Sequence, residues 1–296
     1  MATIDALLRD AVGRLRVAGV ETPRLDAEVL LANVLGIDRA GVIAHSDAPV
    51  GDSAAARFSE AIVRREAGEP VAYISGVREF LGLAFATDRR ALVPRPESER
   101  LVELAEVEIG RRLTLGARPP EAAPIRVVYV GTGSGTIAIA LAVRLSSRRM
   151  LDEVDILAVD DVAETLDLAK ENSVGHAVGD RIRFAQADLI PLPEPPFDVI
   201  VANLPYVATQ ALADLPAPVA FEPRHALDGG PDGLGVIRRL VEILPAALAQ
   251  GGVVFLEIGA DQGSSIVSVV TDLPGRWTCT VERDLAGLPR IARVER

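Results

Sequence analysis

The sequence predicts an α/β fold, in which a mainly parallel sheet carries helices on both faces and follows a small helical domain. From residue 126 onward, apolar runs of strand length alternate with segments of helical periodicity, which is typical of a parallel sheet. Before residue 69, apolar residues recur mainly at helical spacing. We therefore expect a helical domain at 1–68, a β-hairpin linker at 69–95 and an α/β domain at 96–296.

The N-terminal domain is predicted to contain three helices. Apolar residues share one helical face at 4–15 and again at 25–34, and a third helix is expected over 53–67. Gly19 and Gly36 lie where the first two helices should end. A helical unit of this size commonly serves packing or recognition, and we expect this one to recognise a substrate.

The predicted linker holds two short runs of strand-forming residues, at 71–74 and 83–86, with Gly76 and Gly82 between them. This pattern favours a hairpin. Prolines then prevent a helix until about Pro96, which suits a first helical turn. A proline-rich gap follows at residues 118–120.

The C-terminal two thirds of the chain alternate between strand and helix. Strands are predicted at 126–130, 154–159, 181–186, 197–202, 251–258, 276–281 and 290–294, and helices near 134–145, 162–172, 232–249 and 261–271. Because only a short segment joins the last two strands, they are expected to form an antiparallel edge.

Composition restricts the function classes. The net charge of −11 argues against broad, sequence-independent binding of nucleic acid. No apolar run reaches the ~18 residues of a membrane span, and the N-terminus lacks the features of a signal peptide. Cys279 is the single cysteine and the three histidines are scattered, so no metal site is expected. These observations favour a cytoplasmic protein.

A glycine-rich loop follows the first strand of the α/β domain and precedes a helix. Its glycines permit a sharp turn and a close ligand approach, and the helix N-terminus offers free N–H groups. Thr136 breaks the Gly-x-Gly-x-x-Gly spacing of dinucleotide loops, and the lysine of a phosphate-binding loop is absent. The spacing suits a ligand without phosphates, such as S-adenosylmethionine. The candidate cofactor loop comprises Gly131, Thr132, Gly133, Ser134 and Gly135.

Two acids follow the next two strands. Asp160 ends the second strand, where a carboxylate can accept hydrogen bonds from both hydroxyls of a ribose. The structural alternative is a helix cap shared with Asp161. After the third strand, Asp188 is placed to reach an adenine amine, with Leu189 packing on the ring. A ribose-binding acid alone does not separate NAD from S-adenosylmethionine.

The fourth strand ends in Asn203, Leu204, Pro205 and Tyr206. Ligands of open α/β sheets bind at this edge. An asparagine oxygen can accept a hydrogen bond from an attacking N–H group, the proline makes the turn rigid, and a tyrosine can stack on a flat substrate. We interpret this tetrapeptide as a catalytic site for a planar amine or amide; an ordinary exit from a strand is the alternative.

A strand, a Gly-x-Gly-x-Gly loop, an acid and Asn-x-Pro-Tyr together resemble the class I methyltransferases that modify planar nitrogens. Within these, the chain resembles the HemK/PrmC family, the glutamine methyltransferases of peptide chain release factors. The segments that carry the resemblance are Glu-Pro-Val-Ala-Tyr-Ile-Ser-Gly at 69–76, Arg-Glu-Phe at 78–80, Val-Pro-Arg-Pro-Glu-Ser-Glu at 93–99, Phe-Glu-Pro-Arg at 221–224, Asp-Gly-Gly-Pro-Asp-Gly at 228–233, Leu-Glu-Ile-Gly at 256–259 and Asp-Leu-Ala-Gly at 284–287. The Pro-Arg-Pro-Glu and Glu-Pro-Arg parts are the most specific.

The resemblance implies a class I methyltransferase domain with a mostly parallel seven-stranded sheet, S-adenosylmethionine as cofactor and release factors as protein substrates. It implies that the Asn203 side-chain oxygen and the Leu204 carbonyl accept the two hydrogens of the substrate glutamine amide. Tyr206 would stack on the amide plane. Asn203 is also expected to contact the cofactor.

Two residues depart from the family pattern. Leu204 replaces the first proline of Asn-Pro-Pro-Tyr, and Asn-Leu-Pro-Tyr resembles the ribosomal RNA adenine dimethylases. Tyr129 stands where the family carries an acid for the cofactor's ammonium group, so we expect Tyr129 to contact the cofactor with reduced affinity. The alternatives are therefore a methyltransferase acting on an exocyclic amine of nucleic acid and a catalytically impaired family member that only binds. An NAD-dependent dehydrogenase is disfavoured by the glycine spacing.

Four charged residues flank these motifs: Arg95, Glu97, Glu222 and Arg224. They are expected either to pair and brace the pocket or to contact the protein substrate.

Overall fold

The computed structural model describes residues 1–114, 123–284 and 286–296; the proline-rich segment 118–120 and Leu285 lie outside these ranges. The chain forms two compact units. One comprises Met1–Val77 with Leu215–Phe221, and the other Arg78–Asp214 with Glu222–Arg296. None of the helices within the described ranges combines the length and the apolar character that a bilayer crossing requires.

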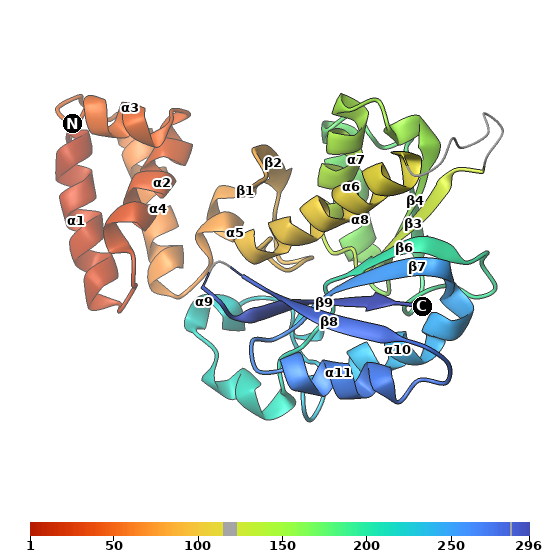
Figure 1. Ribbon diagram of the computed structural model, residues 1–296. Helices are drawn as coiled ribbons and strands as arrows, with labels where there is room; N and C mark the ends of the chain where they lie inside the picture. The colour runs from red at the N-terminus through yellow and green to blue at the C-terminus, as the bar shows by residue number, and fades with distance from the viewer. Residues whose placement is uncertain (115–122, 285) are drawn as a thin grey trace. The chain divides into compact units, whose positions relative to one another are not determined.

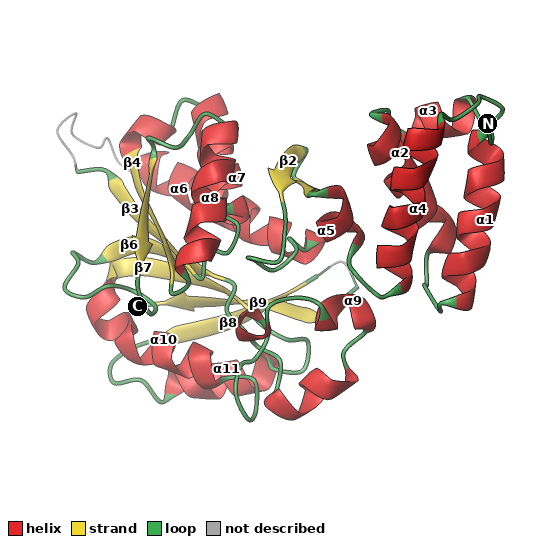
Figure 2. Cartoon of the chain, turned by 180° about the vertical axis from the view of Figure 1, so that it is seen from behind, coloured by secondary structure: helices red, strands yellow, loops and turns green. Residues whose placement is uncertain are grey.

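The N-terminal unit is helical, as Figure 2 shows for α1 to α4. Its helices are α1 (Ile4–Val17), α2 (Pro23–Leu35), α3 (Arg39–Ala44), α4 (Asp52–Glu66), α5 (Val71–Ser75) and α9 (Ala217–Ala220). Thr3 caps α1 by accepting a hydrogen bond from the Ala6 N–H at 3.2 Å, and Gly36 ends α2 with a φ of 68°. The short helix α3 was not predicted, because its six residues are too few to show a period.

The predicted strand at 71–74 is wrong. These residues belong to α5, which begins after Pro70 and ends at Gly76 with a φ of 75°. The N–H groups of Tyr73 and Ile74 both donate to the Pro70 carbonyl. Local capping therefore overrides the strand propensity of Val, Tyr and Ile.

The predicted hairpin exists, but its first strand starts later in the chain. It pairs β1 (Val77–Phe80) with β2 (Leu83–Ala86). Leu81 and Gly82 form its two-residue turn with φ angles of 51° and 76°. Two positive φ angles are the pattern of a turn whose twist matches that of the strands.

Within the described residues, seven strands form one sheet in the order β5-β4-β3-β6-β7-β9-β8. They are β3 (Ile125–Val130), β4 (Val154–Asp160), β5 (Ile182–Gln186), β6 (Phe197–Ala202), β7 (Leu248–Glu257), β8 (Thr278–Arg283) and β9 (Pro289–Glu295). The pairs from β5 to β7 are parallel, and β9 runs antiparallel to both β7 and β8. The predicted α/β fold with an antiparallel end is confirmed.

Helices cover both faces of this sheet (Figure 1). One face carries α6 (Glu99–Thr114), α7 (Thr136–Ser147) and α8 (Ala163–Gly175), and the other carries α10 (Gly235–Ala247) and α11 (Gly263–Thr271). Alternate residues of β3 enter the two cores: Val127 and Tyr129 on one side, Val128 and Val130 on the other. Burial on both faces explains why the central strands are almost continuously apolar. Short 3-10 turns complete the fold: η1 (Pro96–Ser98), η2 (Leu151–Glu153), η3 (Thr209–Asp214) and η4 (Arg224–Ala226).

The strand order places a crevice at the carboxyl end of β3. The chain continues from β3 to β4 on one side, whereas β6 lies on the other side. Such a reversal of direction is where open α/β sheets bind ligands. The glycine loop, Asp160 and Asn203 follow β3, β4 and β6, so they meet at this edge.

Candidate active site

A cavity lies at the carboxyl edge of the sheet and gathers most of the predicted site residues. Those that line it are Tyr129, Gly131, Thr132, Gly133, Ser134, Asp160, Asp188, Leu189, Asn203, Leu204 and Pro205. Two predicted residues that the structure also describes, Gly135 and Tyr206, do not line it. Its other walls include residues 91–95 and His225, and of these the sequence analysis expected only Arg95 at the pocket.

The glycine loop is shaped by close packing. Gly131, Gly133 and Gly135 have φ angles of 70°, 55° and 80°, a region that favours glycine. A Cβ at Gly135 would lie 2.8 Å from the Ile139 side chain and 3.1 Å from the Ala169 backbone. Gly135 therefore lets the loop pack on α7 and α8 instead of facing the cavity, which explains its absence from the cavity wall.

Asp160 braces this loop. One carboxylate oxygen accepts a hydrogen bond from the Gly133 N–H at 2.8 Å, and the other accepts from the Val162 N–H at 3.1 Å. Burial raises the pKa of Asp160 above its ordinary value, against the lowering effect of these N–H donors. Because each carboxylate oxygen has further lone pairs, Asp160 retains acceptor capacity toward the cavity.

Thr132 brings an unsatisfied polar atom to the same wall. Its hydroxyl oxygen is buried and has no hydrogen-bond partner among the described residues. Buried hydroxyl groups are normally satisfied, so this one fits a bound molecule with polar atoms.

The acid predicted to meet an adenine is held by a cation. Asp188 forms an ion pair with Arg239, and both side chains are exposed at the cavity. Leu189 follows with a φ of 63°, an unusual conformation for a residue with a side chain.

At the tip of β6, the Asn203 side chain enters a hydrogen-bond relay. Its Nδ2 atom donates to the Ser98 hydroxyl at 3.0 Å, and this hydroxyl donates to Oε2 of Glu257 at 2.6 Å. Ser98 and Glu257 are both buried. Burial raises the pKa of Glu257 to about 6, although the Ser98 hydrogen bond opposes this.

The residues after Asn203 have different environments. Leu204 is buried against the glycine loop, where a Cβ on Gly131 would lie 3.1 Å from its side chain. The Tyr206 carbonyl accepts a hydrogen bond from Gln262 at 3.0 Å. Burial raises the pKa of the Tyr206 hydroxyl to about 12, so its ring is neutral at physiological pH.

Tyr129 is buried at the base of the cavity. Burial, and the negative charge of Glu257 after it, raise the pKa of its hydroxyl well above the ordinary value of 10. Tyr129 therefore carries no charge and does not replace a carboxylate electrostatically.

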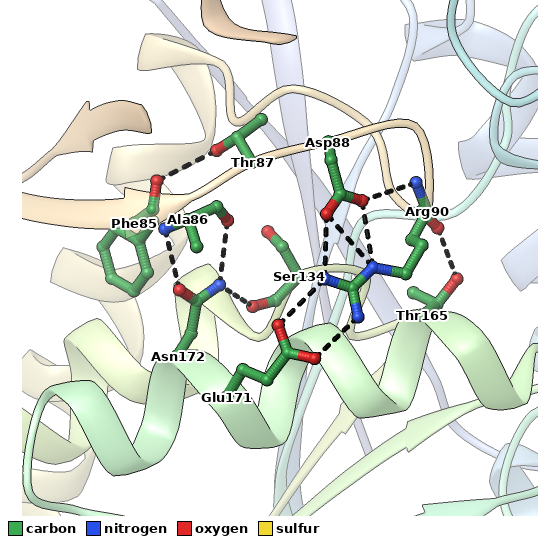
Figure 3. Close-up of polar contacts among 9 residues, drawn as sticks. All are labelled: Phe85, Ala86, Thr87, Asp88, Arg90, Ser134, Thr165, Glu171 and Asn172. Carbon is green, nitrogen blue, oxygen red and sulfur yellow. Dashed lines mark hydrogen bonds and ion pairs between the residues drawn. The ribbon is translucent and has the colours of Figure 1, made fainter. Parts of the chain in front are cut away.

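The segment that follows the hairpin is anchored to α8 and the glycine loop (Figure 3). Asn172 donates to the carbonyls of Ala86 at 3.1 Å and Ser134 at 2.9 Å, and accepts from the Ala86 N–H at 2.8 Å. Thr165 donates to the Arg90 carbonyl at 2.6 Å, and the Arg90 guanidinium pairs with Glu171 at 2.8 Å. These contacts hold the wall formed by residues 91–95.

Glu222 fastens the same wall from the other side. It accepts from the Val93 N–H at 3.0 Å and from the Arg95 guanidinium at 2.5 Å. Burial raises its pKa despite the arginine. Arg224 instead pairs with Asp228 at 3.3 Å. The expected bracing therefore involves Arg95 and Glu222.

Sequence reasoning missed the side chains that position others. Ser98, Asn172 and Glu257 all lie in segments whose role was assigned to packing or to a motif as a whole. One signal was available for Glu257: an acid that directly follows the apolar run 253–256 is expected at the carboxyl edge of the sheet, where the predicted site lies. No local pattern singles out Asn172.

The fold and the site together define a class I methyltransferase. The chain matches the family model "RMKL-like, methyltransferase domain" over residues 131–211 and that of the "PrmC N-terminal domain" over residues 6–76. The catalytic domain of hMettl16, solved in complex with a MAT2A 3′UTR hairpin, superposes with a TM-score of 0.54 at 17% identity. That likeness covers 82% of this chain and 81% of that chain, and it shows the fold alone.

Curated relatives give the family. The release factor glutamine methyltransferase of Moorella thermoacetica is 38% identical over 97% of this chain and 96% of its own length. Those of Nitratidesulfovibrio vulgaris and Deinococcus radiodurans are each 35% identical over 98% of this chain, covering 94% and 97% of their lengths. The chain belongs to the family of release factor glutamine methyltransferases, and the resemblance inferred from the motifs is confirmed.

Proposed function

We propose that this protein transfers a methyl group from S-adenosylmethionine to the side-chain amide nitrogen of the glutamine in the Gly-Gly-Gln loop of peptide chain release factors. The names of relatives that match nearly the whole chain support the reaction and the substrate. The observation that carries the proposal is the side-chain amide of Asn203 at the wall of a cavity whose other walls suit a nucleoside.

The residues present fit the cofactor. The unsatisfied Thr132 hydroxyl and the glycine loop offer a polar, closely approachable wall. Asp160 would hold the ribose, and Asp188 with Leu189 the adenine. When bound, S-adenosylmethionine supplies an electrophilic methyl group on a sulfonium sulfur.

The difficulty of the reaction lies in the substrate nitrogen, whose lone pair is delocalised into the neighbouring carbonyl. We assign the Asn203 side-chain oxygen and the Leu204 carbonyl as acceptors for the two amide hydrogens. Both dipoles would present their negative ends to the positive charge that grows on nitrogen, which is electrostatic preorganisation. Holding the amide in line would supply several kcal/mol of a total of roughly 8 or more. The N–C bond would form as the methyl–sulfur bond breaks, which leaves a neutral thioether. The methylated nitrogen would then be acidic enough to lose its proton to solvent without a strong base.

The test is methyl transfer from labelled S-adenosylmethionine to a purified, unmodified release factor, with the modified site mapped by mass spectrometry. We expect label on the glutamine of the Gly-Gly-Gln loop, and none on a release factor in which that glutamine is replaced by alanine. Cofactor binding without transfer to the release factor would contradict the substrate assignment and direct the search to ribosomal RNA. A failure to bind the cofactor would contradict the proposed reaction, and would indicate that Tyr129 cannot replace the acid of the family pattern.

A further inference from the structure

The relay from Asn203 to Glu257 joins three segments that are far apart in the sequence. Asn203 follows β6, Ser98 ends η1, and Glu257 ends β7. The two hydrogen bonds measure 3.0 Å and 2.6 Å. Asn203 and Ser98 line the cavity, whereas Glu257 lies behind them, 2% exposed.

The chemistry of these groups fixes the direction of both hydrogen bonds. An ionised carboxylate only accepts, so the single hydroxyl proton of Ser98 goes to Glu257. The Ser98 oxygen then has only lone pairs to offer Asn203. It must therefore face the NH₂ group of the asparagine amide, and the amide oxygen must point the other way.

We propose that Glu257, acting through Ser98, is a positioning residue that holds the Asn203 side chain with its oxygen directed to the reacting amide. This inference rests on the proposed function and deepens it, because that oxygen is the acceptor the substrate amide needs. The opposite orientation would present N–H donors to the N–H donors of the substrate.

Protonation of Glu257 would release this control. A neutral carboxyl group can donate to Ser98, whose proton is then free to point at Asn203, and the asparagine amide is no longer held in one orientation. The groups that act on Glu257 come from each neighbouring element: Glu97 on η1, Arg95 before it, Arg290 on β9, and the tyrosines at 129 and 206. Burial is the largest cause that raises the pKa of Glu257 to about 6; Glu97 raises it further, and Ser98, Arg290 and Arg95 lower it.

Side-chain NMR tests the relay without any methyl acceptor. The asparagines of the sequence are Asn33, Asn172 and Asn203, so selective ¹⁵N-asparagine labelling gives a simple spectrum. We expect the Asn203 amide resonances to titrate with a midpoint near pH 6 in the wild-type protein. Asn172 is the internal control, because among the described residues its side-chain amide bonds only to backbone groups.

Two variants decide the outcome. In Ser98→Ala and in Glu257→Gln, the Asn203 titration near pH 6 should disappear while the Asn172 resonances stay unchanged. An Asn203 titration that persists in both folded variants would overturn the inference, as would a wild-type Asn203 that does not respond between pH 5 and 8.

Kinetics give the second readout. Ser98→Ala should lower kcat by about tenfold, which is a smaller effect than the loss of the Asn203 contact itself. The KM for the cofactor should stay nearly unchanged. Ser98→Thr keeps the hydroxyl and should recover most of this loss. The fall of wild-type kcat below pH 6 should be absent in Glu257→Gln. Glu108→Gln, another buried carboxylate, should leave the pH profile as in the wild type.

The two proposals fail separately. If the wild-type protein does not methylate a release factor, the proposed function is wrong, and the NMR titration still decides whether the relay operates. If the wild type methylates a release factor and Ser98→Ala has unchanged kcat and pH dependence, the relay is wrong and the proposed function stands.

Discussion

Glu28 in the N-terminal unit and Glu257 in the methyltransferase unit are almost equally buried, at 3% and 2% exposure, but their pKa values shift in opposite directions. Burial alone would raise the pKa of Glu28, yet the guanidinium groups of Arg39 and Arg24 contact it at 2.9 and 2.8 Å and lower that pKa below its ordinary value. Glu257 receives only the Ser98 hydroxyl as a close partner among the described residues, and its pKa rises to about 6.

The partners of a buried acid therefore help to separate a structural acid from a functional one. Two cations satisfy the Glu28 charge, so the helical unit gains from the ionised form. At the carboxyl edge of the sheet, burial makes the ionised form of Glu257 unfavourable, and its pKa rises to about 6. Unfavourable ionisation at a cavity is typical of groups retained for function.

The largest expected effect comes from removing the group at the end of the relay. Asn203→Ala should lower kcat by ~10²-fold or more, by analogy with loss of one charge-stabilising contact in a preorganised site. Cofactor affinity, measured by calorimetry, should change little. Wild-type turnover in a folded Asn203→Ala protein would contradict the assigned mechanism and remove the reason for keeping Glu257 ionised.

The next effect is on stability. Because the pKa of Glu257 rises from 4.5 to about 6 on folding, the folded state binds more protons, and the free energy of unfolding decreases as pH rises through this interval. The cost of the ionised form is about 2 kcal/mol above pH 6. Glu257→Gln should therefore become more stable relative to wild type by that amount between pH 4.5 and 7.

Urea unfolding at several pH values measures this difference. Only its change with pH matters, because the substitution also alters hydrogen bonding at every pH. A stability difference that stays constant from pH 4.5 to 7 would mean that Glu257 has an ordinary pKa, and the contrast with Glu28 would be lost.

Asp160 is intermediate between Glu28 and Glu257, because its carboxylate accepts hydrogen bonds from two backbone N–H groups but has no arginine partner among the described residues. Asp160→Ala should weaken S-adenosylmethionine binding by roughly tenfold or more, because a charged hydrogen-bond acceptor is lost. Asp167→Ala, on the exposed side of α8, is the matched control and should bind normally. Unchanged binding in Asp160→Ala would refute the ribose assignment and leave loop bracing as its role.

The smallest effect is expected at Glu28. Glu28→Gln should reduce the stability of the helical unit by about 1 kcal/mol at pH 7, discounted because both arginines are largely exposed. Since the pKa of Glu28 is lowered, its contribution is present at neutral pH and disappears as pH falls through that pKa. Hydrogen exchange in α2 at neutral and acid pH measures this. A change in kcat of the Glu28→Gln protein would contradict the contrast between a structural Glu28 and a functional Glu257.

Some differences between expectation and structure have local causes. The strand prediction fails at Val71–Ser75 because these residues favour strands, and because Pro70 and Gly76, which cap the helix, are also common in turns. The hairpin itself was predicted, because its turn at Gly82 and its second strand are local signals. The glycine loop was located correctly, yet the role of Gly135 in helix packing depends on Ala169.

Patterns of residues adjacent in the chain predict the seven strands of the sheet, the helices that alternate with them, the glycine loop and the Asn-Leu-Pro-Tyr tip, but not the short helices Arg39–Ala44 and Val71–Ser75. The side chains that hold this tip in place come from distant parts of the sequence. Asn203 and Ser98 are 105 positions apart, and Ser98 and Glu257 are 159 apart. The fold brings η1 to the ends of the neighbouring strands β6 and β7, and this places the three residues within hydrogen-bond distance. The direction of the Ser98 hydroxyl proton is therefore set by Glu257, and no pattern of neighbouring residues in the sequence connects the two.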